Sequence, residues 1–330
     1  MRALGRFLGR LVLVLILLGG ALWWFGPYEP VELNARFDPR KFGEGVQVYF
    51  ESVEARHDDI TPGVEKRVIW RPGFEERRTP WSVLYLHGFS ATSEEIRPVP
   101  DRVAEALGAN LVFERLAGHG RGGTAMAEPA AHDWMLDVAE GLAAARAVGE
   151  RVVVISTSTG GTLATAAAVD PELSRDVAAM VFISPNFGIN DPAAFALTLP
   201  AARWWLPKVV GETYSFAPRN AAHGRFWTTS YPTVALLPMA ALVERVVDLD
   251  VSGVTIPALF RLSDADKVVR PDITRAVAAR WGGPVAIQAV EMGPQDDPNA
   301  HVIAGDIQSP GQTDATVRDI LDWLERVGVK

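Results

Sequence analysis

A chain of 330 residues, 48% of them hydrophobic, can bury a large core as one domain with an insertion or as two domains. Its formal net charge of -8 argues against a nucleic-acid partner, because phosphate binding needs a basic face. The absence of cysteine excludes disulfides, thiolate metal ligands and a cysteine nucleophile.

The N-terminus carries a localisation signal. An uncharged run, residues 11–25, follows three arginines and ends in aromatic residues. Counted from Phe7, it approaches the roughly 20 residues that span a bilayer, and tryptophan and tyrosine favour the lipid–water interface. The residues concerned are Arg2, Arg6, Arg10, Trp23, Trp24 and Tyr28.

This pattern predicts an uncleaved signal anchor over residues 1–30. The membrane would then be a partner of the chain through this segment. The arginines would be cytoplasmic and the rest of the chain exported, to the periplasmic or extracellular side. The alternative is a secretory peptide that is removed, with which Gly19-Gly20-Ala21 is compatible.

Two apolar stretches, residues 46–54 and 64–70, are separated by Thr61-Pro62-Gly63 and predict an antiparallel opening to a sheet. Residues 81–86 form the first strongly apolar strand and lead directly into His87-Gly88-Phe89. Thr92 and Glu95 then suggest a capping box for a helix that reaches Leu107, bent or delayed by two prolines.

Strands and helices alternate from there on. We expect strands at 110–114, 151–155, 178–184, 257–262 and 285–290, and helices at 133–148, 160–169 and 313–327. This rhythm predicts an α/β fold with a mostly parallel sheet and helices on both faces. The loop 117–123 matches the string G-x-G-x-x-G, but no clear helix starts there, so we do not expect dinucleotide binding.

One long segment, residues 186–256, breaks the rhythm. It holds nine aromatic residues and one good helical stretch, residues 234–247. A segment so rich in aromatic residues is unlike a disordered linker, and we interpret it as an inserted helical cap. The predicted organisation is an anchor (1–30), a core in two parts (31–185 and 257–330) and a cap insertion (186–256).

The central stretch is Ile155-Ser156-Thr157-Ser158-Thr159-Gly160-Gly161, where a buried apolar strand meets a helix of small residues. Ser158 therefore lies in a sharp strand-to-helix turn. Such a turn lifts the hydroxyl off the sheet and points the first helical N–H groups at whatever Ser158 attacks.

A serine nucleophile needs a base and an acid that orients the base. Of the histidines after Ser158, only His301 follows the final strand, in a loop before the last helix. Between them, the loop after residues 257–262 offers two acids, Asp264 and Asp266.

With these motifs the chain resembles an α/β-hydrolase of the capped carboxylesterase, monoglyceride-lipase and serine-aminopeptidase branch, from about Trp81 onward. The resemblance rests on His87-Gly88-Phe89, Ser156-x-Ser158-x-Gly160, Asp266-Lys267-Val268-Val269 and His301-Val302-Ile303. Their order, serine, acid, histidine, is the order of that fold.

The resemblance implies Ser158 as nucleophile, His301 as base and Asp266, rather than Asp264, as the orienting acid. It implies an oxyanion hole formed by the backbone N–H groups of Phe89 and Thr159. The sequence departs from the family pattern at Ser156, where the first glycine of the turn is expected. A small residue is needed there, and serine is small.

For the remaining histidines the sequence predicts less specific roles. The family implies that His87 supports the oxyanion loop, and we expect His119 to be structural or to line the pocket. His57 and His132 are expected to face solvent, and His223 to have an ordinary polar role in the cap.

These features predict a membrane-anchored serine hydrolase that cleaves carboxylic esters without metal or cofactor. An apolar cap and an anchor favour a lipophilic small-molecule ester, monoacylglycerol-like or of short to medium acyl chain. A peptidase or acyltransferase of the same fold is one alternative, and a non-catalytic binding protein at the membrane surface is another.

Overall fold

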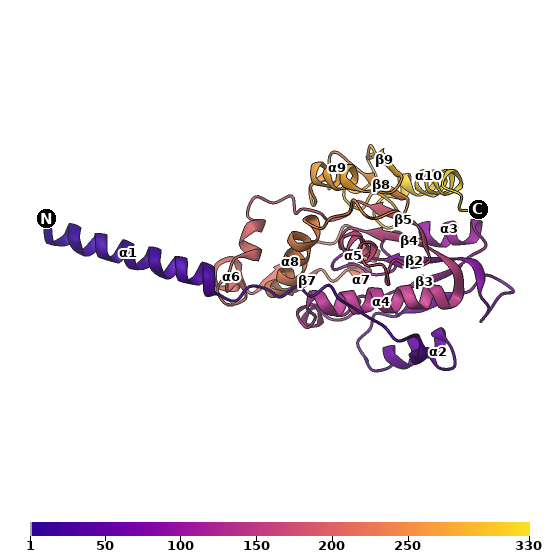
Figure 1. Ribbon diagram of the computed structural model, residues 1–330, viewed down its shortest axis with the longest axis horizontal. Coiled ribbons are helices and arrows are strands. Elements are labelled where there is room, and N and C mark those ends of the chain that lie inside the picture. The colour runs from indigo at the N-terminus through magenta and orange to yellow at the C-terminus, as the bar shows by residue number, and fades with distance from the viewer. Residues whose placement is uncertain (1) are drawn as a thin grey trace.

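The computed structural model of the chain describes residues 2–330, without the side chains of residues 2, 3 and 5. Met1, the first residue of the predicted anchor, and the side chain of Arg2 lie outside this described part. Figure 1 shows the helix α1 (Arg2–Phe25) projecting away from a body in which helices surround a central sheet.

The sheet has seven strands in the order β1, β3, β2, β4, β5, β8, β9. Neighbouring strands are parallel except β1 and β3, which are antiparallel. The strands are β1 (Arg67–Ile69), β2 (Thr79–Leu86), β3 (Asn110–Phe113), β4 (Gly149–Thr157), β5 (Val177–Ile183), β8 (Ala258–Leu262) and β9 (Val285–Ala289). The predicted α/β class with a mostly parallel sheet is confirmed.

The central strands of the sheet are buried on both faces, as β4 illustrates, whereas the edge strand β9 is partly exposed. Val152 and Val154 belong to one hydrophobic cluster and Val153 and Ile155 to the other, because side chains alternate along a strand. The first cluster contains residues of α4 (Ala131–Val148), α5 (Thr159–Ala168), α8 (Leu236–Val247) and α9 (Pro271–Arg280). The second contains residues of α3 (Val99–Ala106) and α10 (Thr313–Arg326). This cover explains the uninterrupted apolar strands of the sequence.

Residues 46–54, predicted as a strand, instead form the helix α2 (Val46–Glu54). Val46, Phe50 and Glu54 are buried while Val48 is exposed, which is the four-residue spacing of a helix and not the alternation of a strand. The antiparallel opening of the sheet is therefore only β1, which lies within the predicted stretch 64–70 and pairs with β3.

The helix predicted from Thr92 starts only at Val99, after Pro98. The predicted capping box does not form, because the Glu95 carboxylate accepts the backbone N–H of Gly88 instead. The other elements predicted from residue 81 onward differ from the observed ones by at most two residues at either end. The chain also forms the short 3-10 helices η1 (Pro39–Phe42), η2 (Gly123–Ala127) and η5 (Pro310–Gln312).

The long segment between β5 and β8 contains two kinds of structure. Leu242 and Val243 of α8 join the cluster that covers the sheet, whereas Ala202 and Leu206 form a separate cluster with Leu237. The last part of the predicted insertion thus packs on the core. We call residues 186–235 the cap: η3 (Ala194–Thr198), α6 (Ala202–Val210), β6 (Thr213–Ser215), α7 (Ala221–Phe226), β7 (Ser230–Pro232) and η4 (Thr233–Ala235).

Candidate active site

Ser158 lies in the turn between the end of β4 and the start of α5. Its backbone has φ 50° and ψ -118°, a left-handed φ that a serine adopts only where the surroundings hold it. Here the N–H of Ser158 donates to the carbonyl of Ile183 at 3.1 Å, and the carbonyl of Ser158 accepts the N–H of Asn186 at 3.0 Å. The end of β5 thereby fixes the turn, and Ser158 stands in front of the N-terminus of α5.

The small residues around Ser158 are required by close packing. A Cβ atom on Gly160 would lie 2.2 Å from the carbonyl oxygen of Leu86, a distance that no side chain tolerates. Ser156, the departure from the family pattern, is fully buried, and its hydroxyl donates to the carbonyl of Val181 at 3.1 Å. A serine at this position is therefore accommodated in the sheet.

The structure brings the three residues of the predicted triad together. His301 Nε2 lies 3.1 Å from Ser158 Oγ, and His301 Nδ1 lies 2.9 Å from Asp266 Oδ2. The other carboxylate oxygen of Asp266 accepts the backbone N–H groups of Val268 and Val269 at 2.8 and 2.9 Å. Oδ1 of Asp266 is thus held by the backbone, and Oδ2 faces His301. A proton on Nδ1 leaves Nε2 free to accept the hydroxyl proton of Ser158.

The environment of His301 shifts its pKa upward. Burial by itself lowers the pKa of this imidazole, but the Asp266 carboxylate beside it raises the pKa, so that the net shift is above the ordinary value. A buried base that gains its proton more readily than free histidine suits proton transfer near neutral pH.

A second acid, Asp297, holds the loop that carries His301. Its carboxylate accepts the backbone N–H groups of His301 and Val302 at 3.1 and 3.0 Å. Asp264, the alternative acid of the sequence, instead forms an exposed ion pair with Arg275 at 2.8 Å. Asp297 was not identified from the sequence, because its role depends on the folding of a loop without a distinct pattern.

The predicted oxyanion loop lies across from Ser158. Within residues 2–330, the backbone N–H groups of Phe89 and Thr159 donate no hydrogen bond to the protein. A Cβ atom on Gly88 would lie only 3.1 Å from the Cβ of Ser158, so the loop approaches the serine closely. Two unpaired donors beside a serine are what an oxyanion hole requires.

Glu95, placed by the sequence in a helix cap, lies under this loop. It is buried, and Oε2 accepts the N–H of Gly88 at 2.8 Å and the hydroxyl of Tyr85 at 2.9 Å. Burial raises the pKa of the Glu95 carboxyl to about 7, against the lowering effect of these donors. Glu95 also lines the same cavity as Ser158 and His301.

His87 and His119 form a buried pair behind the oxyanion loop, with ring centroids 5.1 Å apart. His87 Nε2 accepts the backbone N–H of Leu116 at 3.1 Å, which links the loops after β2 and β3. Burial lowers the pKa of His87 well below its ordinary value and that of His119 to about 4, so both rings are neutral.

The other histidines are distant from this chemistry or peripheral to it. His57 is exposed and His132 is partly exposed. His223 of the cap lines the cavity, and its ring accepts the backbone N–H of Arg219 at 3.0 Å.

A cavity of about 770 Å³ lies over Ser158 and His301, between the core and the cap. Most of its wall comes from the cap and from α8. Its apolar lining includes Leu197, Leu206, Val210, Tyr231, Leu236 and Met239. The volume is in the range of pockets that hold small organic ligands.

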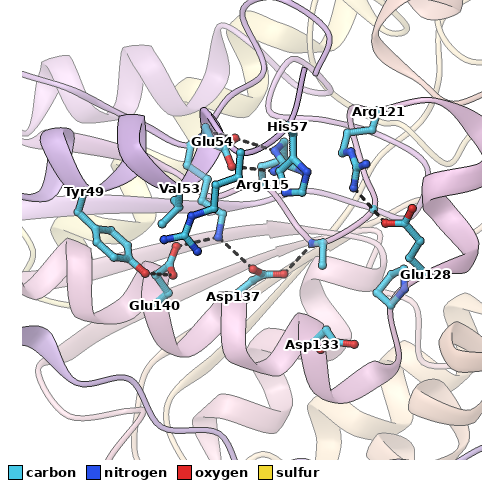
Figure 2. Close-up of a pocket in the computed structure, with 15 residues that line it drawn as sticks. Tyr49, Val53, Glu54, His57, Arg115, Arg121, Glu128, Asp133, Asp137 and Glu140 are labelled. Atoms are coloured by element: carbon cyan, nitrogen blue, oxygen red, sulfur yellow. Dashed lines mark hydrogen bonds and ion pairs between the residues drawn. The ribbon is translucent and has the colours of Figure 1, made fainter. Parts of the chain in front are cut away.

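Figure 2 shows the residues that line a second, polar cavity of about 480 Å³. It shares no lining residue with the first cavity. It borders a buried ion cluster in which Lys66 Nζ lies 2.8, 3.0 and 2.7 Å from carboxylate oxygens of Glu114, Asp137 and Glu140. Burial alone lowers the pKa of Lys66, but the three carboxylates raise it well above the ordinary value.

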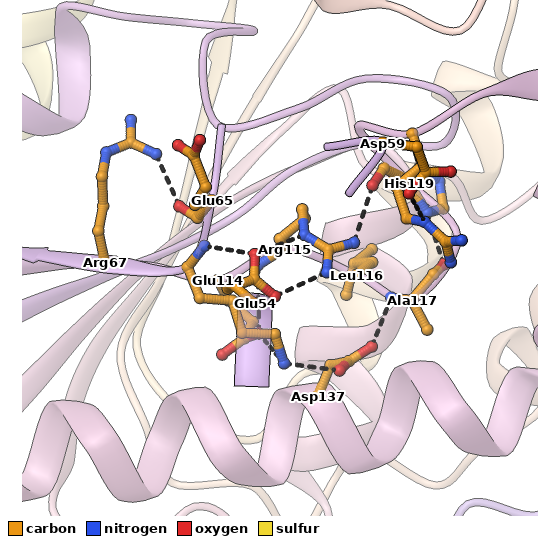
Figure 3. Close-up of polar contacts among 12 residues, drawn as sticks. Glu54, Asp59, Glu65, Arg67, Glu114, Arg115, Leu116, Ala117, His119 and Asp137 are labelled. Carbon is orange, nitrogen blue, oxygen red and sulfur yellow. Dashed lines mark hydrogen bonds and ion pairs between the residues drawn. The ribbon is translucent and has the colours of Figure 1, made fainter. Parts of the chain in front are cut away.

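The ion cluster ties the N-terminal part of the body to the core. In Figure 3, the Arg115 guanidinium contacts the carboxylate of Glu54 at the end of α2, at 2.7 Å, and Asp137 of α4 accepts the N–H of Ala117. The same loop carries Leu116, the partner of His87. The cluster holds the loop that contains Leu116, and Leu116 contacts His87. It therefore supports the loop that faces Ser158 indirectly, through His87.

Comparison with known proteins agrees with this architecture. Residues 83–305 match the alpha/beta hydrolase family. The thermostable monoacylglycerol lipase of Bacillus sp. (strain H-257) is 30% identical over 198 residues, which cover 60% of this chain and 75% of that protein. The chain belongs to the alpha/beta hydrolase family, in its monoacylglycerol lipase and esterase-like branch. The predicted resemblance is confirmed, and the protein is a lipase- or esterase-type hydrolase distantly related to a monoacylglycerol lipase.

Solved structures share the fold. One from work on the metagenome-derived lipolytic enzymes LipS and LipT has a TM-score of 0.62 at 19% identity, covering 81% of this chain and 99% of that chain. The monoacylglycerol lipase of Paleococcus ferrophilus has a TM-score of 0.52 at 18% identity, covering 81% of this chain and 100% of that chain. The helix α1 lies before the part that the family match covers.

Proposed function

We propose that the protein is a membrane-anchored serine hydrolase that cleaves carboxylic esters through an acyl-enzyme intermediate. The observation that carries this proposal is the chain of contacts from Ser158 Oγ through His301 to Asp266, at 3.1 and 2.9 Å. In this proposal Ser158 is the nucleophile, His301 the general base and Asp266 the acid that orients it.

In the first half of the reaction, Ser158 Oγ attacks the ester carbonyl carbon while its proton passes to His301 Nε2. The negative charge on the carbonyl oxygen is held by the N–H groups of Phe89 and Thr159. When the tetrahedral intermediate collapses, the bond to the alcohol oxygen breaks and His301 gives its proton to the leaving alcohol.

In the second half, His301 takes a proton from water, and the water oxygen attacks the acyl carbon on Ser158. The second tetrahedral intermediate releases the carboxylic acid, and the proton on His301 returns to Ser158 Oγ. Asp266, in contact with Nδ1 of His301, stabilises the imidazolium formed in each half.

The substrate class is supported by the apolar cavity and by the relationship to monoacylglycerol lipases. A wall that includes leucine, valine and methionine side chains favours an acyl chain, beside polar residues that include Glu95, Arg219 and His223. We therefore propose lipophilic esters, monoacylglycerol-like or of short to medium acyl chain.

The membrane anchor is supported by α1. Residues 6–25 form an apolar helix whose side chains are outside the folded body, long enough to cross a bilayer. The proposal places Arg6 and Arg10 on the cytoplasmic side and the hydrolase body on the exported side.

A substrate series tests the proposed activity. Hydrolysis should be measured on p-nitrophenyl and glycerol esters of increasing acyl length, with an aminopeptidase substrate included, for the wild type and Ser158→Ala. We expect ester cleavage that favours lipophilic acyl groups and is lost in the variant. Cleavage of the aminopeptidase substrate in preference to every ester would replace the proposal with a peptidase, and no turnover of any substrate would favour a binding protein.

A further inference from the structure

A buried amide, that of Asn186, lies in the apolar part of the cavity over Ser158. Asn186 is only 5% exposed and lines this cavity. Its Nδ2 donates to the sulfur of Met239 at 3.4 Å, and its Oδ1 has no hydrogen-bond partner among residues 2–330. Because a thioether is a weak acceptor, most of the hydrogen-bonding capacity of this amide is unused. Buried polar groups in proteins are normally paired, so the unpaired amide in a substrate cavity points to a ligand.

The backbone of Asn186 is held firmly beside the nucleophile. Its N–H donates to the carbonyl of Ser158 at 3.0 Å, and its carbonyl accepts the hydroxyl of Thr162 at 2.6 Å. The preceding residue, Pro185, packs against α5, where a Cβ atom on Gly161 would lie 2.7 Å from the Cβ of Pro185. The amide is therefore carried by a rigid segment next to the catalytic turn, as a substrate-binding group requires.

The neighbours of Asn186 place it on the side of the cavity that suits an acyl chain. Met239, which its amide contacts, belongs to α8. Leu236 of the same helix and Leu197 of the cap also line the cavity. In the proposed function this apolar wall holds the acyl chain of the ester. Asn186 is thus a polar group where an unsubstituted acyl chain would need an apolar one.

We propose that Asn186 is a specificity-determining residue that binds a hydroxyl group on the acyl chain, near the scissile carbonyl. This inference rests on the proposed ester hydrolysis and narrows its substrate class to esters of hydroxylated carboxylic acids. A hydroxyl both donates and accepts, so it can pair with the oxygen or with the N–H of the amide. An unsubstituted chain would set methylene groups against the amide and leave it unpaired, which is unfavourable. Because Asn186 is bonded to the backbone of Ser158, we place the hydroxyl on the second or third carbon of the chain.

A comparison of matched esters tests the proposal in the wild type. Ethyl hexanoate, ethyl 2-hydroxyhexanoate and ethyl 3-hydroxyhexanoate differ only in the hydroxyl group. The full chain is kept in detergent, and kcat/KM for each ester is measured by titration of the acid released. We expect kcat/KM for at least one hydroxylated ester to exceed that for ethyl hexanoate by about tenfold.

Substitution of the amide then assigns this preference to Asn186. Asn186→Leu replaces the amide by an apolar group of similar size, and Asn186 does not have the positive φ that would disfavour leucine. The ratio of kcat/KM for the hydroxylated ester to that for ethyl hexanoate should fall to about one. The matched control is Asn299→Leu, at an exposed asparagine that lines the same cavity, and this variant should keep the wild-type ratio.

The ratio within one protein does not depend on how much of the enzyme is folded, so partial unfolding does not imitate the expected result. Asn186→Ala makes the same test with a smaller side chain if the leucine variant does not fold. It also removes the amide, and it should lower the ratio in the same direction.

The outcomes distinguish this inference from the proposed function. Equal kcat/KM for the three esters in the wild type would overturn the inference and leave ester hydrolysis intact. A preference for the hydroxylated ester that persists in Asn186→Leu would also overturn it, because another residue would then bind the hydroxyl. No turnover of any ester by the folded wild type would overturn the proposed function itself, and the inference with it.

A fourth substrate, 1-hexanoylglycerol, tests the placement of the hydroxyl on the acyl chain. Its hydroxyl groups belong to the alcohol part of the ester. We expect Asn186→Leu to leave the ratio of kcat/KM for this ester to that for ethyl hexanoate within about twofold of the wild-type ratio. A tenfold fall of this ratio, with no change in the preference for hydroxylated acids, would mean that Asn186 binds the alcohol part and would contradict the proposal.

Discussion

Oδ2 of Asp266 lies 2.9 Å from Nδ1 of His301, whereas the carboxylate of Asp264, two residues earlier, is paired with Arg275 at the surface. Asp266→Asn should therefore lower kcat by about 10³–10⁴, because the amide stabilises the wrong tautomer of the imidazole. Asp264→Asn should leave kcat nearly unchanged. Steady-state kinetics on a soluble p-nitrophenyl ester measure both, and a larger loss in Asp264→Asn would reverse the assignment.

The pKa of His301 sets the acid limb of the pH profile. His301 must be neutral to accept the proton of Ser158, and Asp266 raises its pKa above the ordinary value despite burial. Activity should thus fall as pH drops, with a midpoint above that of free histidine. In Asp266→Asn the carboxylate is gone and burial remains, so the midpoint of the residual kcat/KM should move to lower pH. An identical midpoint in both proteins would contradict this origin.

The hydrogen bond from Gly88 N–H to Glu95 predicts a positioning role for this carboxyl. Glu95→Ala leaves the N–H of Gly88 without its acceptor and the hydroxyl of Tyr85 with Thr157 Oγ1 alone, at 3.1 Å, and the oxyanion loop is free to shift. A misplaced loop of this kind costs about 10²-fold in kcat. Glu95→Gln keeps an acceptor oxygen and should retain activity to within about tenfold.

The measurement for Glu95 is the comparison of kcat and KM in these two variants. A merely structural residue would lower the amount of folded enzyme and leave kcat per active site unchanged. Active-site titration therefore decides: equal kcat per titrated site in Glu95→Ala and the wild type would contradict the positioning role.

The Lys66 cluster predicts a stability effect with a defined pH dependence. Lys66→Met leaves Glu114, Asp137 and Glu140 buried together without their cation, which costs about 3–5 kcal/mol at neutral pH. Burial raises the pKa of Glu114 well above its ordinary value and also raises that of Asp137, so protonation of these two carboxyls relieves the repulsion and the deficit should shrink as pH falls toward 5. Denaturant unfolding at both pH values measures it. The exposed control Lys41→Met should change stability by no more than about 0.5 kcal/mol, and a similar small effect of Lys66→Met would contradict the assignment.

The sequence predicts an element correctly where the spacing of its apolar residues matches the set of side chains that the fold buries. The apolar runs of β4, β5 and β8 are covered on both faces, so their length and composition predict strands directly. Residues 46–54 were misassigned because Val46 and Val48 imitate alternation, while the buried residues are spaced by four. The helix α3 was predicted too long because Glu95 accepts from Gly88 instead of capping a helix.

The residues of the candidate site fall into two groups, those that sequence motifs predict and those that only the folded structure identifies. Ser158, Asp266 and His301 follow from short motifs at the ends of strands, and their order along the chain places them on one edge of a parallel sheet. Glu95 and Asp297 hold backbone N–H groups of loops, through contacts that only the folded chain creates. No residue spacing in the sequence predicts these contacts of Glu95 and Asp297.

The central claim is that Ser158 is the nucleophile, and covalent labelling tests it most directly. The full chain is treated with a fluorophosphonate, and the mass of the protein and the labelled peptide are determined for the wild type and for Ser158→Ala. We predict one adduct per wild-type chain, located at Ser158, and none in the variant. Failure of the wild type to react, or an adduct that persists in Ser158→Ala, would contradict the assignment.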